Sequence, residues 1–134
     1  MTLIPILLLI LTGAIALYDG RTRRVPNAVT LPLLAAGLAL HFPGSPALWA
    51  GTLVLFVAWH GGALGGGDAK LWMALLWLAP PEAGSGAALV MGLVLIGTAL
   101  AQLAWRALRG RRVLGVRSPG AWRAIPFAAW LLFI

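Results

Sequence analysis

Cysteine is absent from this chain of 134 residues, and acidic side chains are rare, with only three Asp and Glu residues in total. The absence of cysteine excludes disulfides, thiolate metal sites and a cysteine nucleophile. Two histidines and a single tyrosine leave few other side chains for catalysis. The carboxylates are therefore the first candidates for any chemistry that the protein performs.

Charged residues of any kind make up only 10% of the chain, whereas hydrophobic residues make up 61%. This balance is far from the average of soluble domains. Long apolar runs recur along the sequence, which predicts an all-α integral membrane protein with a single domain over residues 1–134. The first run, residues 1–18, lacks a basic segment before it and is followed by further apolar runs. We therefore interpret it as a permanent span and not as a signal peptide.

Residues that favour turns divide the apolar sequence into six predicted transmembrane helices. The predicted helices cover residues 3–18, 28–42, 47–59 or 47–64, 68–79, 87–108 and 124–134. The segments between them are rich in glycine, proline or arginine, which do not continue an apolar helix.

All ten Lys and Arg residues lie in or beside the loops that follow the first, third and fifth predicted helices. Basic residues collect in the cytoplasmic loops of membrane proteins. We therefore predict a multi-pass protein of a cytoplasmic membrane, with these loops facing the cytoplasm and both termini outside. The same rule accounts for the net charge of +7, so we expect contact with membrane lipid and no nucleic-acid partner.

Asp19 and Asp68 stand beside loops that are predicted to face the cytoplasm, at the end of the first helix and the start of the fourth. Glu82 falls in a loop on the opposite side and is a poor partner for either aspartate. Ionisable side chains at membrane depth are energetically unfavourable and usually have a functional role. The two aspartates are therefore the candidate functional pair.

The fourth predicted helix is short, because Asp68 to Ala79 spans only twelve residues before Pro80-Pro81. Such a helix extends about 18 Å, whereas the hydrocarbon core of a membrane is about 30 Å thick. Asp68 is then below the membrane surface, and the glycines before it are irregular backbone that must be buried or line water. We predict a glycine-rich cleft that opens to the cytoplasm with Asp68 at its floor. The alternative is one continuous helix over residues 64–79, interrupted only by its glycines.

Two aspartates that approach one water molecule cannot both ionise cheaply, so the pair would share a proton. The ionised member can act as a general base on water, and the protonated member can polarise a carbonyl and protonate the leaving amine. This chemistry needs no cofactor and no metal. His60 with the two aspartates is the one candidate set of metal ligands, and it lacks local ligand spacing. Asp68 could also cap the fourth helix, which is compatible with catalysis.

Several neighbouring residues are candidates for supporting roles. Gly65 and Gly67 allow a tight turn and close approach of a substrate chain, or else close packing between helices. Asn27, which follows Pro26, is expected to cap the second helix. Lys70 either offsets the charge of the aspartates or extends to the membrane interface.

Two segments of the sequence together resemble the type IV prepilin peptidases, which are GxGD intramembrane aspartyl proteases. The first is Asp19 followed by a basic loop and Val25-Pro26-Asn27. The second is Gly65-Gly66-Gly67-Asp68-Ala69-Lys70-Leu71, which matches the pattern GxGDxKL. Ile125-Pro126-Phe127 resembles a further element near the family's C-terminus, although Ala128-Ala129 stands where the family often has Gly-Pro.

The resemblance implies an endopeptidase that removes the short basic leader from pilin-like precursors at the cytoplasmic side of a bacterial or archaeal membrane. Asp19 and Asp68 match the family's catalytic positions, and Gly65, Gly67, Lys70, Pro26 and Asn27 would support catalysis or contact the substrate. The chain lacks the cysteines and the long first loop of family members that carry an N-methyltransferase region. It therefore resembles the short, peptidase-only form associated with Flp/Tad pili, and no methyltransferase domain is expected.

A second interpretation comes from a different functional class. Asp68 and Lys70 could form an ion or proton site in a small membrane transporter or an ion-binding channel subunit. This interpretation is weaker, because the sequence has no visible internal repeat and no second interrupted helix that corresponds to the fourth.

Overall fold

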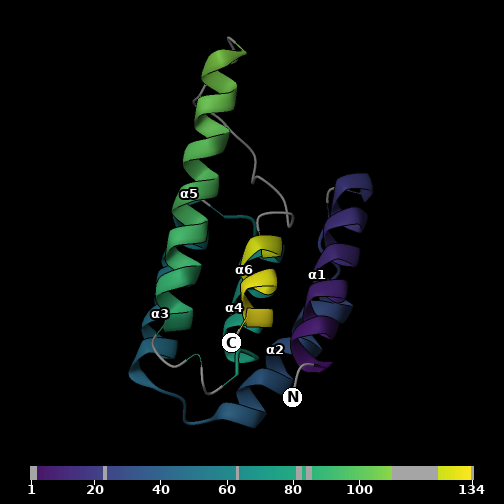
Figure 1. Ribbon diagram of the computed structural model, residues 1–134, viewed down its shortest axis with the longest axis vertical. Helices are drawn as coiled ribbons and strands as arrows, with labels where there is room; N and C mark the ends of the chain where they lie inside the picture. Colours follow the sequence, from purple (N-terminus) through teal and green to yellow (C-terminus); the bar gives the residue numbers. More distant parts are fainter. Residues whose placement is uncertain are drawn as a thin grey trace.

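The computed structural model describes residues 3–22, 24–62, 64–80, 83, 86–109 and 124–133, and within them the regular secondary structure is entirely helical. Within these residues the chain forms six α-helices and a short C-terminal 3-10 helix (Figure 1). They are α1 (Leu3–Thr22), α2 (Asn27–His41), α3 (Pro46–His60), α4 (Gly66–Trp77), α5 (Gly86–Leu108), α6 (Ile125–Trp130) and η3 (Leu131–Phe133). This order of helices confirms the order predicted from the sequence.

α4 lies at the centre of the bundle, in contact with α2, α3 and α5. α2 runs parallel to α4, because Asn27 at its start bonds to Lys70 and Gly37 near its end meets Trp77. α3 runs antiparallel to α4, because Thr52 in its first half bonds to Trp77 near the end of α4.

α6 joins the remaining helices to this centre. It packs against both α1 and α5, and Figure 1 shows it between them. Phe127 of α6 is fully buried, and the centroid of its ring lies 5.8 Å from the ring centroid of Trp72 in α4. η3 continues the contact with α1. Every helix except α2 therefore adds a large apolar side chain to the buried core around α4.

The outside of the bundle also carries many large apolar side chains. Leu7 of α1 is 62% exposed and Leu93 of α5 is 69% exposed, and many other large hydrophobic side chains on α1, α3 and α5 are also exposed. Exposed apolar faces of this extent mark contact with lipid or with another protein. Together with the length and composition of α1 and α5, they indicate a membrane protein.

Among the helices in the described part of the chain, two are long and apolar enough to cross a membrane by themselves: Leu3–Thr22 and the segment Gly86–Trp105 of α5. α2 and α3 are apolar but shorter, with 15 residues each. α4 has 12 residues and α6 has six. Full crossing of the membrane by the four shorter helices stays a prediction.

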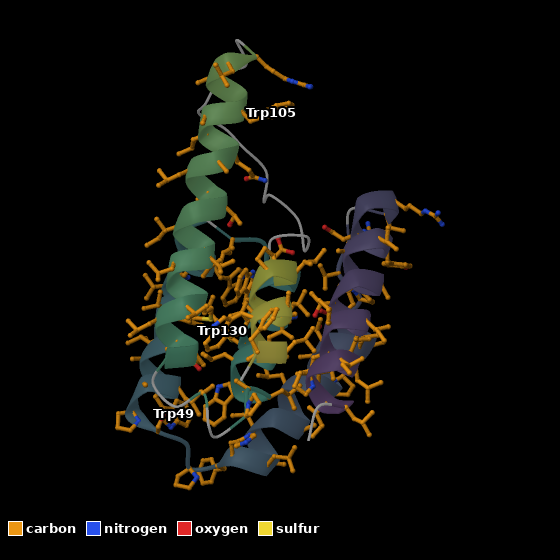
Figure 2. The ribbon with its side chains drawn as sticks, viewed as in Figure 1. Trp49, Trp105 and Trp130 are labelled. Carbon is orange, nitrogen blue, oxygen red and sulfur yellow. The ribbon has the colours of Figure 1, made fainter. Side chains whose placement is uncertain are left out.

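Two exposed tryptophans mark opposite ends of the molecule. Trp49 lies at the start of α3 and Trp105 near the end of α5, and Figure 2 shows them far apart along the long axis. Tryptophan is enriched at both membrane–water interfaces. Their placement agrees with the interpretation that the bundle extends between two interfaces.

Three predicted boundaries are wrong by a few residues. α1 continues through Asp19 to Thr22, whose hydroxyl donates to the Tyr18 carbonyl at 2.8 Å, so no loop begins at Asp19. α4 begins at Gly66 and not at Asp68, because few amides of a first helical turn need internal partners and glycine is tolerated there. It also ends at Trp77, before Ala79. Gly65 is extended, with φ −69° and ψ 150°, so the alternative of one continuous helix over residues 64–79 is wrong.

Candidate active site

The first turn of α4 lies directly against the loop that follows α1. A side chain at Gly67 would place its Cβ 2.6 Å from Cβ of Val25. Real Cβ atoms do not approach so closely, so the contact depends on the glycine. Two segments that lie 42 positions apart in the sequence therefore meet at one end of the bundle.

A hydrogen bond joins the same two segments one turn further along α4. Lys70 Nζ donates to Asn27 Oδ1 at 3.1 Å. The expectation that Asn27 caps α2 is wrong, because the cap position is Pro26 and no side chain caps the helix. The amides of Val29 and Thr30 instead donate to the Pro26 carbonyl. The Asn27 amide group is thus directed to α4, and Lys70 has a specific partner there.

Asp68 is the third residue of α4 and is only 5% exposed. The interpretation of Asp68 as the helix cap is wrong, because Gly65 holds that position and its carbonyl accepts from the Ala69 amide at 2.9 Å. Burial of a carboxyl group among apolar helices is energetically unfavourable, so a carboxyl group found there usually has a functional role. A water-filled cleft at this carboxylate stays a prediction.

Asp19 lies in the last turn of α1 and is partly buried. It precedes Val25 by six positions, so it lies at the same end of the bundle as the first turn of α4. α1 packs mainly against α6 and η3, and α6 in turn contacts α4 through Phe127 and Trp72. The structure therefore brings the two sequence motifs together, while direct pairing of Asp19 with Asp68 stays a prediction.

The glycine run has contacts that sequence reasoning did not identify. A Cβ at Gly66 would lie 3.2 Å from Nε1 of Trp59, near the end of α3. The run thus fits α4 against α3 on one side and against the first loop on the other. The glycines signalled close approach, but their partners Trp59 and Val25 are distant in the sequence and carried no signal of their own.

His60 stands apart from this arrangement. It is exposed at the end of α3, with its ring stacked on that of Phe56 at 6.3 Å between centroids. Within the described part of the chain, no group of three His, Cys, Asp or Glu residues could hold a metal ion. The alternative of a metal site at His60 gains no support. Glu82 lies outside the described residues.

The chemistry available at this end of the bundle is that of carboxylates. Asp68 is buried and Asp19 is partly buried. Lys70 is a positively charged residue at the same end, where it donates a hydrogen bond to Asn27. The chain has no cysteine that could act as a nucleophile. Carboxylic acids in such a setting can exchange protons with a water molecule or a substrate.

Comparison with known proteins identifies the family. The sequence profile of the type IV leader peptidase family matches residues 6–105, a range that covers most of α1, all of α2 to α4 and most of α5. No curated protein and no solved structure matches the chain. The matched range is well over half of the chain and contains both motifs that meet at the first turn of α4. The chain therefore belongs to the type IV leader peptidase family, a family of membrane-associated peptidases.

Proposed function

We propose that this protein is an intramembrane aspartyl endopeptidase that removes the short basic leader from pilin-like precursors at the cytoplasmic side of the membrane. The observation that carries the proposal is the contact of Val25 with Gly67 in the first turn of α4, together with the bond of Asn27 to Lys70 one turn further along. This contact puts the segments that carry Asp19 and Asp68 at the same end of the bundle. Membership of the type IV leader peptidase family supports the peptidase activity and the class of substrate.

The proposed reaction uses one ionised and one protonated aspartate. The ionised carboxylate takes a proton from water while the water oxygen attacks the carbonyl carbon of the scissile peptide bond. The protonated carboxyl group donates to the carbonyl oxygen and stabilises the tetrahedral intermediate. The C–N bond then breaks as the leaving nitrogen receives a proton, which yields one new carboxylate and one new amine. Asp19 and Asp68 can each take either role.

The orientation follows from the basic residues at the end where the two motifs meet. Arg21 and Arg24 flank the turn between α1 and α2, and Lys70 lies in the first turns of α4. Cytoplasmic loops are enriched in such residues, so we place the aspartates at the cytoplasmic side. The apolar helix of a precursor would lie in the membrane against the exposed apolar faces of the bundle, with its leader extending to the aspartates.

The test is cleavage of a synthetic precursor by the purified protein in liposomes. The substrate would carry a short basic leader, a glycine before the cut and an apolar helix, and mass spectrometry would locate the broken bond. We expect a single cut after the glycine, with the same rate in the presence of EDTA because no metal takes part. Absence of cleavage of any such precursor, or loss of cleavage on chelation, would contradict the proposal.

A further inference from the structure

Two contacts attach the first turns of α4 to the start of α2, one on each side of Asp68 in the sequence. Gly67, directly before Asp68, lies against Val25. Lys70, two residues after Asp68, donates its Nζ to Asn27 Oδ1 at 3.1 Å. We call these two contacts the inter-motif clasp.

Two points of attachment restrict a helix more than one. The packing of α4 against its neighbours sets its general position, and contacts on both sides of Asp68 fix this turn further. A change of one residue in helical register would move a side chain by about 1.5 Å along the axis and turn it by about 100°. Because the clasp holds residues before and after Asp68, it limits both movements. The residues that α4 contacts in the clasp are Val25 and Asn27. They follow Asp19 in the chain shortly after the end of α1.

The chemistry of the polar contact fits a positioning role. Asn27 offers a neutral amide oxygen, so it can fix the Lys70 ammonium by a charge-assisted hydrogen bond without placing a third carboxylate near the aspartates. The bond connects two different helices, and the expected alternative for Asn27, a cap of its own helix, is not formed. Capping of α2 is therefore excluded as the role of the amide.

We infer that Asn27 and Lys70 are positioning residues that, with Val25 seated on Gly67, set the placement of Asp68 relative to Asp19. This inference rests on the proposed function, since placement matters only if the two aspartates act together. Neither residue is assigned a proton transfer or a contact with the scissile bond. A displacement of about 1 Å in a reacting group can lower a rate about a hundredfold.

The test is a double-mutant cycle of Lys70→Met and Asn27→Leu, measured as kcat and KM for precursor cleavage. We expect each single variant to lower kcat about tenfold to a hundredfold, with KM changed less than about twofold. Because both variants remove the same hydrogen bond, the double variant should be no slower than the slower single variant. Lys70→Arg keeps a donor and should retain kcat within about threefold.

Arg24→Met is the matched control, since Arg24 is an exposed basic residue of the same loop and its loss removes one positive charge from this end. It should leave kcat within about twofold, as exposed substitutions away from specific contacts usually do. The inference would be overturned by additive losses in the double variant or by an unchanged kcat in both single variants. It would also be overturned by an effect confined to KM, which would make Lys70 a substrate-binding residue.

The outcomes separate the clasp from the proposed function. Suppose that Asp19→Asn and Asp68→Asn abolish cleavage while Lys70→Met and Asn27→Leu leave kcat unchanged. Then the positioning role of the clasp is wrong and the proposed function stands. If Asp19→Asn or Asp68→Asn still cleaves at the normal rate, the proposed function itself is wrong.

Discussion

The two ends of α4 are held by different kinds of contact. At the end that carries Trp77, the indole is buried, packs edge to face with Trp49 at 5.2 Å between centroids, and donates from Nε1 to the Thr52 hydroxyl at 2.9 Å. At the other end, Gly67 lies against Val25, Gly66 lies against the Trp59 indole, and Lys70 donates a hydrogen bond to Asn27. Aromatic packing anchors one end, whereas the other carries the ionisable side chains Asp68 and Lys70.

Glycines allow close approach at both ends, but for different purposes. A Cβ at Gly37 of α2 would lie 2.8 Å from Cβ of Trp77, so that glycine lets two helices pack tightly around a large side chain. Gly67 instead admits a loop residue beside the buried Asp68. The comparison predicts that substitutions at the Trp77 end mainly lower stability and that substitutions at the Asp68 end mainly lower activity.

The largest expected effect is at the aspartates. Asp19→Asn and Asp68→Asn should each lower the rate of precursor cleavage by about a thousandfold or more, because each removes a group that transfers protons. Both variants should still insert in the membrane and unfold at the wild-type denaturant concentration, since Asn has nearly the shape of Asp. Normal cleavage by either variant would show that the two carboxylates do not act as a pair.

Trp77→Ala should produce the largest loss of stability. Truncation of a fully buried tryptophan usually lowers the free energy of unfolding by about 3–5 kcal/mol. Unfolding in mixed detergent would measure the loss, and the fraction that stays folded should keep its specific activity. Trp105→Ala is the matched control, because Trp105 is largely exposed and its loss should change stability by less than about 1 kcal/mol. Equal losses at both positions would remove the distinction between anchor and surface.

A matched pair of glycine substitutions compares the two ends directly. Gly37→Ala forces a methyl group against the backbone and Cβ of Trp77, so it should lower stability by about 1–3 kcal/mol. Gly67→Ala forces a methyl group against Cβ of Val25 directly beside Asp68, so it should displace this turn and lower kcat about tenfold.

The double variant Val25→Gly with Gly67→Ala tests the cause of the activity loss. In this variant the side chain at position 25 is removed and a methyl group is present at position 67, so the clash is relieved. Part of kcat should therefore be restored. If Gly37→Ala changes kcat as much as Gly67→Ala does, the comparison between the two ends fails.

The smallest of these effects is expected at Thr52. Thr52→Val removes the acceptor of the Trp77 Nε1 hydrogen bond and should lower the free energy of unfolding by about 1–2 kcal/mol. Thr52→Ser keeps a hydroxyl group and should lose less than half as much. A wild-type stability for Thr52→Val would mean that the aromatic contacts alone anchor this end.

Much of the fold could be predicted because its signals are local. The fifth helix was expected at residues 87–108 and is observed at Gly86–Leu108, since a long apolar run between a glycine-rich turn and a basic segment defines both boundaries. The start of α4 was misplaced because glycine has a low helix propensity, which packing against Val25 and Trp59 overrides here.

The site could be predicted only in part for the same physical reason. Asp68 and Asp19 were identifiable as rare acids in an apolar chain. The bond between Lys70 and Asn27 was not, because the two residues lie 43 positions apart and a side-chain amide after proline reads locally as a helix cap. Local composition can indicate that a segment is closely approached, as the glycines do, but it does not identify the distant partner.

The proposed reaction requires that Asp19 and Asp68 lie at the same end of the bundle and close enough to act together. The chain has no native cysteine, so cysteines introduced at positions 19 and 68 can crosslink only with each other within one molecule. Position 78 provides the control, since Leu78 follows the last residue of α4 and lies about 15 Å further along its axis. In membranes, with a short bifunctional maleimide, we predict that the pair 19 and 68 crosslinks and the pair 19 and 78 does not. A crosslink between 19 and 78, or none between 19 and 68, would contradict the account.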